Sequence, residues 1–396
     1  MLATFDQFLD FPQDVINLII YITKCKVYDL CLVNKYFNNN AKKIKIIDNK
    51  GYPKLSDEHL KELNLTSLNL EYGLFTNEGI KNLNNLIVLK IDQNNTIIND
   101  SSIKTLTNLT SLKINYTKII THDSIKNLNK LNRLDIAGSN IKDKTIKNLT
   151  LLTYLDISRN NFITDNGIKN LTNLSSLSLF LNENITSIKN FTNLTFLSLF
   201  RNNKITDYEI KYLTTLININ LGYNNTITDT GIKELINITS ITLNSNNKIT
   251  ENGLKYLTNI THLNLAKNHG VSEKFLSEIK NLKSLDISLE NNVTNIGLIK
   301  LTNLISLNIS ANEVITDNGI KRLTNLTKLK MSENELITDN GIKNLTNIIY
   351  IECFSNNITD EGIKYLTNLE VLDAYENDGI TDKVIKYLPK LKKIIR

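Results

Sequence analysis

The apolar residues of this 396-residue chain follow one short pattern that recurs along most of its length. The pattern reads apolar-x-x-apolar-x-apolar, and successive copies begin 20 to 23 residues apart. Its alternating second half has the period of two that is typical of a strand with one buried face. One such strand cannot bury that face alone, so the repetition predicts stacked copies that form a parallel sheet. The copies begin at Leu65, Leu86, Leu109, Leu131, Leu152, Leu174, Leu194, Leu216, Ile238, Ile260, Leu282, Leu304, Leu326, Ile348 and Leu369, with a partial copy at Leu391.

After the predicted strand, most copies carry an asparagine at the ninth position and then a helix signal. The chain must turn at the asparagine, whose amide can bond to loop backbone groups, so we interpret this column as structural. The sequence Ile-Thr-Asp-x-Gly-Ile-Lys-x-Leu, as in 163–171, predicts an N-capped helix of about two turns. These helices should begin near Asp165, Asp207, Asp229, Asp317, Asp339 and Asp360. The asparagines are Asn94, Asn160, Asn182, Asn202, Asn224, Asn246, Asn268, Asn312, Asn334, Asn356 and Asn377.

The repeated unit resembles the leucine-rich repeats of F-box proteins and of bacterial internalins. This resemblance implies an α/β solenoid, a leucine-rich-repeat horseshoe with a parallel β-sheet on its concave face and short helices on its convex face. It implies about 15–16 repeats within residues 48–396. Two copies depart from the pattern: 174–199 lacks the Asp-x-Gly sequence, and 275–301 replaces Gly-Ile-Lys by Phe-Leu-Ser. Local bends or shortened helices are expected there.

Residues 1–47 lack the repeat and predict a small helical domain. Apolar residues between Val15 and Ile22 keep the spacing of an amphipathic helix, and Pro12 suits its first turn. The order Phe-Pro-Gln-Asp-Val at 11–15, followed by Cys-Leu-Val-Asn-Lys-Tyr-Phe at 31–37, resembles the F-box motif. The alternative is a helical cap that closes the open end of the sheet.

The F-box resemblance implies docking on the Skp-type adaptor of a cullin-containing SCF ubiquitin ligase. The repeats would then present an unknown protein substrate to that ligase. Under the alternative, the chain is a plain leucine-rich-repeat binding protein with no ubiquitin role. The adaptor contacts or their supporting core would be Phe11, Pro12, Val15, Ile19, Leu30, Val33 and Phe37.

Positions 3, 5, 7 and 8 of each copy should project from the concave face, where most residues are Ser, Thr, Asn or Asp. One group of aromatic, leucine and arginine residues departs from this polar background. Such residues are enriched at binding hot spots, although packing between neighbouring copies is an alternative. Phe180 and Phe200 share position 7 and should lie side by side. The predicted substrate-binding group is Tyr154, Arg159, Phe180, Leu181, Phe196, Phe200, Arg201 and Tyr223, and a smaller group is Tyr350, Phe354 and Tyr375.

The convex helices carry a column of lysines, and the net charge is +6. Such a column could attract an acidic partner or nucleic acid. However, acidic residues share the same helices, arginine is scarce, and we expect no interleaved aromatics, so a solvated face is favoured and nucleic acid is not an expected partner. The lysines are Lys81, Lys104, Lys126, Lys147, Lys169, Lys189, Lys211, Lys233, Lys255, Lys321, Lys343, Lys364 and Lys386.

The sequence holds no motif that predicts catalysis. Its three cysteines and four histidines are scattered without the spacing of a disulfide framework or metal site, and no phosphate-binding loop or nucleophile motif occurs. No run of about 18 apolar residues and no signal-like leader is present. We therefore expect a non-enzymatic intracellular protein without cofactors or membrane spans.

Overall fold

The computed structural model describes residues 46–48, 57, 60, 65–70, 75–91 and 95–396. The helical segment predicted at the N-terminus and its seven adaptor-binding residues, from Phe11 to Phe37, lie outside these described residues. By its internal contacts the chain divides into two compact units, Met1–Ser178 and Leu179–Arg396.

Short parallel strands, one per repeat, form the sheet of each unit. Within each unit, each strand pairs with the next one along the chain in a register that aligns the apolar columns, as in Leu263 opposite Leu285 and Leu307 opposite Leu329. This confirms the parallel arrangement predicted from the alternation. The first unit contains β1 (Ile46–Asp48), β2 (Ser67–Leu70), β3 (Val88–Ile91), β4 (Ser111–Ile114), β5 (Arg133–Asp135), β6 (Tyr154–Asp156) and β7 (Ser176–Ser178). The second contains β8 (Phe196–Ser198), β9 (Asn218–Asn220), β10 (Ser240–Thr242), β11 (His262–Asn264), β12 (Ser284–Asp286), β13 (Ser306–Asn308), β14 (Lys328–Lys330), β15 (Tyr350–Glu352), β16 (Val371–Asp373) and β17 (Lys393–Ile395).

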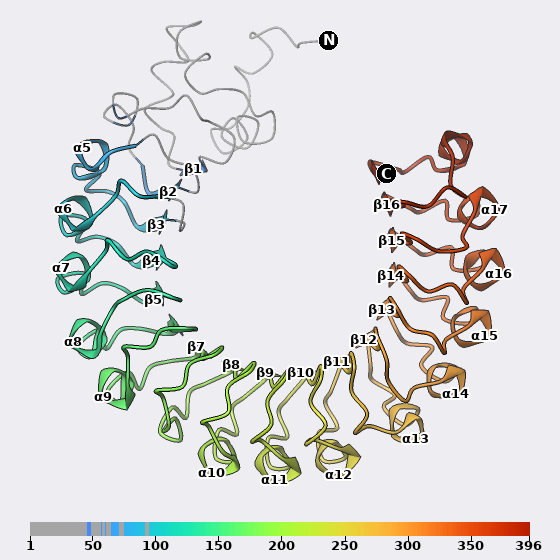
Figure 1. Cartoon of the computed structure of the whole chain (residues 1–396), viewed down its shortest axis with the longest axis horizontal. Helices are drawn as coiled ribbons and strands as arrows, with labels where there is room; N and C mark the ends of the chain where they lie inside the picture. The colour runs from blue at the N-terminus through green and yellow to red at the C-terminus, as the bar shows by residue number, and fades with distance from the viewer. Residues whose placement is uncertain (1–45, 49–56, 58–59, 61–64, 71–74, 92–94) are drawn as a thin grey trace, which may run out of the picture. The chain divides into compact units, whose positions relative to one another are not determined.

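The helices lie on the face opposite the strands, and in Leu179–Arg396 the strands line the inner side of the unit (Figure 1). The α-helices have four residues each, about one turn, so the expected length of two turns is wrong. After Lys169 the chain closes a tighter turn, because Leu171 N–H donates to the Ile168 carbonyl. The α-helices are α5 (Asn77–Ile80), α6 (Asp100–Ile103), α7 (His122–Ile125), α8 (Asp143–Ile146), α9 (Asp165–Ile168), α10 (Asp207–Ile210), α11 (Asp229–Ile232), α12 (Glu251–Leu254), α13 (Glu273–Leu276), α14 (Asn295–Leu298), α15 (Asp317–Ile320), α16 (Asp339–Ile342) and α17 (Asp360–Ile363), followed by the 3-10 helix η3 (Asp382–Tyr387).

The core lies between the strands and the helices of each unit. In the repeat that begins at Leu194, the residues Leu197, Leu199, Ile205 and Ile210 are all fully buried. Burial of such side chains stabilises a fold by about 1.5–3 kcal/mol each relative to exposure. Among the described helices, none is long and apolar enough to cross a membrane.

Buried asparagines bridge adjacent repeats where the strands end, as the sequence predicts. Asn224 is fully buried, and its Oδ1 accepts the N–H groups of Thr226 and Ile227 at 3.1 and 2.9 Å. Its Nδ2 donates to the carbonyl of Asn202, one repeat earlier. In the repeat that begins at Leu86 this place belongs to Asn95, whose Oδ1 accepts the Ile97 and Ile98 N–H groups, whereas Asn94 lies outside the described residues.

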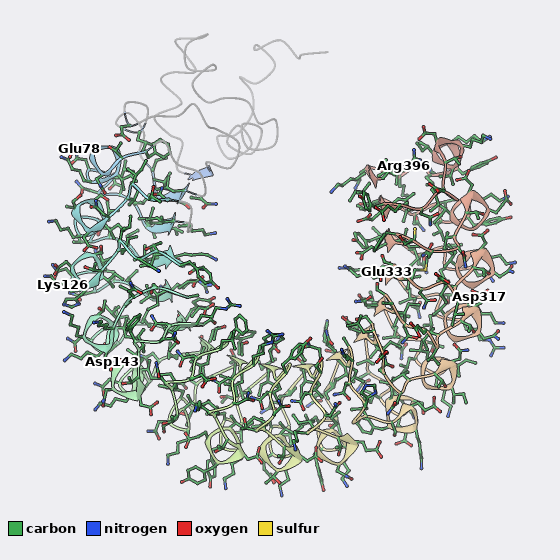
Figure 2. The ribbon with its side chains drawn as sticks, in the orientation of Figure 1. Glu78, Lys126, Asp143, Asp317, Glu333 and Arg396 are labelled. Carbon is green, nitrogen blue, oxygen red and sulfur yellow. The ribbon has the colours of Figure 1, made fainter. Side chains whose placement is uncertain are left out.

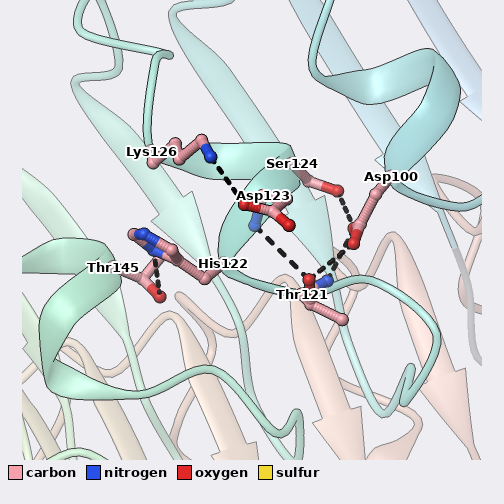
Figure 3. Close-up of polar contacts among 7 residues, drawn as sticks. All are labelled: Asp100, Thr121, His122, Asp123, Ser124, Lys126 and Thr145. Carbon is pink, nitrogen blue, oxygen red and sulfur yellow. Dashed lines mark hydrogen bonds and ion pairs between the residues drawn. The ribbon is translucent and has the colours of Figure 1, made fainter.

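A second ladder joins the starts of successive helices. The Thr250 N–H and hydroxyl both donate to the Asp229 carboxylate at 2.7 Å, although Asp229 belongs to the preceding repeat. Figure 3 shows the corresponding contacts of Asp100 with Thr121 and Ser124. The sequence predicts the N-cap role of the threonine, but this bond between repeats was not predicted.

The bond between aspartate and threonine of adjacent repeats explains the glycine of the Asp-x-Gly sequence. A Cβ at Gly253 would lie 2.6 Å from Oδ1 of Asp229 and 2.9 Å from its Cα, which leaves no room for a side chain. The φ of Gly253 is not in the left-handed region, so its backbone conformation does not require glycine. The carboxylate of the preceding repeat requires it instead.

The first irregular copy, where a local bend or a shortened helix was expected, has no helix at all. Residues 179–195 are all described and contain none. Here the carboxylate of Glu209, which occupies the glycine position of the next repeat, accepts the backbone N–H groups of Ile188 and Lys189 at 2.8 and 3.1 Å. The second irregular copy keeps a four-residue helix, α13, capped by Ser272, so no shortened helix occurs there.

Candidate functional site

The predicted binding group falls where each strand turns away from the sheet. Its position-8 members, Arg159, Leu181, Arg201 and Tyr223, all have φ between 48° and 54°, the left-handed region that L-residues seldom adopt. Backbone bonds to the next repeat hold this turn, as in Arg201 N–H to the Gly222 carbonyl at 2.9 Å. The repeat therefore sets the backbone here, and only the side chains differ from copy to copy.

Three aromatic rings form an edge-to-face row on the strand side of Leu179–Arg396. The ring centroids of Phe180 and Phe200 lie 5.3 Å apart, as do those of Phe200 and Tyr223. The prediction that Phe180 and Phe200 lie side by side is confirmed. We call Phe180, Phe200 and Tyr223 the aromatic ladder. Each edge-to-face pair contributes about 0.5–1.5 kcal/mol beyond its area burial.

Gly222 allows the ladder to form. It occupies position 7 of its repeat, the position held by Phe180 and Phe200 in the two preceding copies. A Cβ there would lie 2.1 Å from Oδ1 of Asn244 in the next repeat and 2.8 Å from Cδ2 of Phe200. Without that Cβ, the Phe200 ring lies against the Gly222 backbone and reaches Tyr223. This residue was not predicted as part of the site, although a lone glycine in this column of the sequence was its visible signal.

Arg201 adds a positive charge to the aromatic ladder. Its guanidinium carbon lies 4.6 Å from the Tyr223 ring centroid and 5.7 Å from that of Phe200. A hydrogen bond with Ser245, and then the interaction with Arg201, lower the pKa of Tyr223. Arg201 is exposed and the three rings are partly exposed, so a partner could reach both the cation and the rings.

The remaining predicted residues are divided between the two units. Tyr154 and Arg159 belong to Met1–Ser178, where the Arg133 guanidinium covers the Tyr154 ring at 3.9 Å. Burial, and then the charges of Asp156 and Asp135, raise the pKa of Tyr154. Within Leu179–Arg396, Leu181 and Phe196 are partly exposed, and Phe196 makes no aromatic contact with a described residue.

The helix side differs from the expectation in one respect. Exposed tyrosines directly follow lysines of the column, and Lys255 lies 5.3 Å from the Tyr256 ring centroid. The expectation of no interleaved aromatics is therefore wrong. Each such lysine covers a tyrosine of its own helix region, as Lys364 does for Tyr365 at 5.2 Å.

The aromatic ladder offers apolar faces and one cation, a composition suited to binding. Among the described residues, no group of three or more His, Cys, Asp or Glu side chains could hold a metal ion. The arrangement can bury an apolar or aromatic side chain and pair an acidic group with Arg201.

Comparisons with known proteins identify the repeat. The family model described as Leucine Rich repeat matches residues 148–172, 212–236, 300–323 and 322–345. The chain therefore contains leucine-rich repeats, and none of these matches falls within residues 1–47. No curated protein matches the sequence.

Solved structures share the fold. The chain is similar to the functional domain of InlJ from Listeria monocytogenes, with 25% identity, a TM-score of 0.50 and coverage of 84% of this chain and 72% of that one. It is also similar to a TLR13–ssRNA13 complex, with 22% identity and a TM-score of 0.61, and covers 62% of that chain with 88% of its own. An internalin, InlF, from Listeria monocytogenes is 26% identical with a TM-score of 0.43, over 85% of this chain and 88% of that one.

Proposed function

We propose that this leucine-rich-repeat chain is a non-enzymatic scaffold that captures a protein partner on the aromatic ladder and Arg201. The observation that carries the proposal is the row of three partly exposed rings, each in contact with the next, with an arginine against two of them. The fold supports it, because leucine-rich repeats are typically binding scaffolds without catalytic groups. Aromatic and arginine side chains contribute most of the free energy at protein interfaces.

The composition of the surface indicates what the partner presents. Burial of the exposed ring area favours an apolar or aromatic side chain, at roughly 25 cal/mol per Å² of apolar surface removed from water. Arg201 favours a carboxylate beside that side chain, because a guanidinium binds carboxylates with two parallel hydrogen bonds. We therefore expect an apolar anchor next to an acidic residue in the partner.

Removal of two rings should abolish partner capture. The variant Phe180→Ser/Phe200→Ser is expected to reduce the recovery of specific co-purifying proteins by at least about 10-fold, the effect of losing one or two hot-spot residues. The measurement is quantitative affinity purification of the full chain from its own cells, with circular dichroism to verify the fold.

The matched control is Tyr208→Ser/Tyr256→Ser, which removes two helix-side tyrosines that are 53% and 50% exposed. This variant should recover the same proteins as the wild type. Equal recovery by both double variants would refute the ladder as the interface.

A second, finer proposal concerns residues 1–47. The F-box-like order of 11–15 and 31–37 supports a role as the substrate-recognition subunit of an SCF-type ubiquitin ligase. In that role the N-terminal segment binds a Skp-type adaptor and the aromatic ladder binds the substrate. The competing proposal is that the segment only caps the solenoid.

A pull-down with a purified Skp-type adaptor separates these two proposals. The intact chain should bind the adaptor, Leu30→Asp/Val33→Asp should reduce binding at least about 10-fold by placing charges in an apolar contact, and Phe180→Ser/Phe200→Ser should bind normally. If the intact chain does not bind where a known F-box protein does, the ligase role is wrong.

A further inference from the structure

A second aromatic pair on the strand side of Leu179–Arg396 has surroundings of the opposite charge. Phe354 and Tyr375 hold position 7 of two adjacent repeats, with ring centroids 6.3 Å apart and an angle of 49° between the rings. Tyr375 is 50% exposed, and Phe354 is partly exposed. We call these two residues the C-terminal aromatic pair.

Three acidic residues belong to the turns that carry or adjoin this pair. Glu333 holds position 8 of the repeat before that of Phe354, and Glu376 holds position 8 of the repeat that contains Tyr375; both are exposed, and Asp373 lies two residues before Tyr375. The Glu333 N–H donates to the Phe354 carbonyl at 3.0 Å, which ties that turn to the pair. Figure 2 shows Glu333 on the strand side of the unit, away from Asp317 on the helix side. None of the three carboxylates forms an ion pair with a described residue.

The same sheet shows how a cation is held when the chain supplies one. Lys330 bonds to the Glu352 carboxylate at 2.7 Å, and the Tyr350 hydroxyl donates to it at 2.9 Å. Lys328 lies 5.2 Å from the Tyr350 ring centroid. These contacts outweigh the effect of burial and lower the pKa of Glu352, while burial and then Glu352 raise the pKa of Tyr350 to about 12.

Tyr375 differs from every other tyrosine of this unit. The other seven each have a lysine or arginine of the chain within 4.6 to 5.3 Å of the ring centroid. No described cation lies over Tyr375 or Phe354. The neighbour of Tyr375 is Glu376, whose hydrogen bond and charge raise the pKa of Tyr375. The pair therefore combines uncovered aromatic faces with unpaired negative charge.

We propose that the C-terminal aromatic pair, with Glu333, Asp373 and Glu376, is a subsite that binds an arginine or lysine side chain of a protein partner. A cation over an aromatic face is attracted by the negative potential of the ring, and nearby carboxylates strengthen that attraction. The subsite does not depend on the aromatic ladder, which carries the opposite charge.

A labelled arginine nonapeptide tests this subsite by fluorescence anisotropy with the full chain. The chain has a net charge of +6, so its overall field repels this probe and binding must come from a local negative surface. We expect binding at low salt that weakens as salt is added, and no comparable binding of a neutral glycine–serine nonapeptide.

Two variants separate the rings from the carboxylates. Phe354→Leu/Tyr375→Leu keeps the charges and should weaken binding by about 3- to 30-fold, the range for loss of a cation–π contact. Glu333→Gln/Glu376→Gln changes only exposed side chains, which guards against an effect of misfolding, and should weaken binding by a similar factor. Glu313→Gln/Glu335→Gln is the matched control, because it removes two exposed carboxylates from neighbouring repeats and should bind like the wild type.

Three results would overturn the proposal. These are no binding of the arginine peptide by the wild type, equal weakening in the matched control, and unchanged binding by the leucine double variant. Normal arginine-peptide binding by Phe180→Ser/Phe200→Ser would keep this result separate from the outcome for the aromatic ladder.

Discussion

Replacement of Asn224 by alanine should lower the free energy of unfolding by about 3–5 kcal/mol. The variant leaves the N–H groups of partly buried Thr226 and buried Ile227, and the carbonyl of buried Asn202, without their partner. Each unsatisfied buried backbone group costs about 1–3 kcal/mol, because water cannot replace the lost bond. Urea unfolding followed by circular dichroism measures the loss.

The adjacent residue provides the control. Asn225 is exposed, so Asn225→Ala should change stability by less than about 0.5 kcal/mol. Because each repeat contacts only its neighbours, hydrogen exchange in Asn224→Ala should accelerate first at Ile227 and in the repeats on either side. If the two alanine variants unfold at the same urea concentration, the buried asparagines that bridge adjacent repeats are not a main source of stability.

The fixed period made much of the fold predictable. In a solenoid, the position of a residue within its repeat is also its position in space, so equal positions in adjacent copies become neighbours. For this reason the parallel strands, the role of Asn224 and the contact of Phe180 with Phe200 could all be read from the sequence. The helix length could not, because the hydrogen bonds that end each helix after one turn leave no separate mark in the apolar pattern.

Interactions between residues at different positions of neighbouring repeats were not predictable in this way. Gly222 has no room for a side chain because Phe200 of the preceding repeat and Asn244 of the next one lie against it. Tyr154 is covered by Arg133 of the preceding repeat. Each of these contacts depends on a particular pair of side chains, and the repeat pattern describes only the columns.

The strand side of Leu179–Arg396 thus carries two aromatic surfaces of opposite charge. Arg201 makes the aromatic ladder basic, and Glu333, Asp373 and Glu376 make the C-terminal aromatic pair acidic. Charge complementarity sets register and suppresses wrong partners more than it sets affinity. A partner that contacts both surfaces would therefore have a defined orientation along this sheet.

Replacement of Glu209 by glycine should lower the free energy of unfolding by about 3 kcal/mol, although glycine is the usual residue at this position of the repeat. Its carboxylate accepts the N–H groups of Ile188 and Lys189, and Ile188 is 1% exposed. Hydrogen bonds to charged groups contribute about 1.5–3 kcal/mol each. Elsewhere the preceding repeat supplies an aspartate that fills this space, as Asp207 does against Gly231, but residues 179–195 form no helix that could supply one.

Substitution toward a repeat consensus commonly stabilises a protein. Glu209→Gly therefore distinguishes a stabilising effect of the consensus glycine from a destabilising loss of the Glu209 carboxylate. Glu209→Gln keeps an acceptor and should cost only about 1 kcal/mol, in line with a neutral hydrogen bond. Glu234→Ala removes an exposed glutamate from the next repeat and should be close to neutral. Urea unfolding of the three variants checks the order, and a Glu209→Gly protein at least as stable as the wild type would show that the loop at Ile188 does not need this carboxylate.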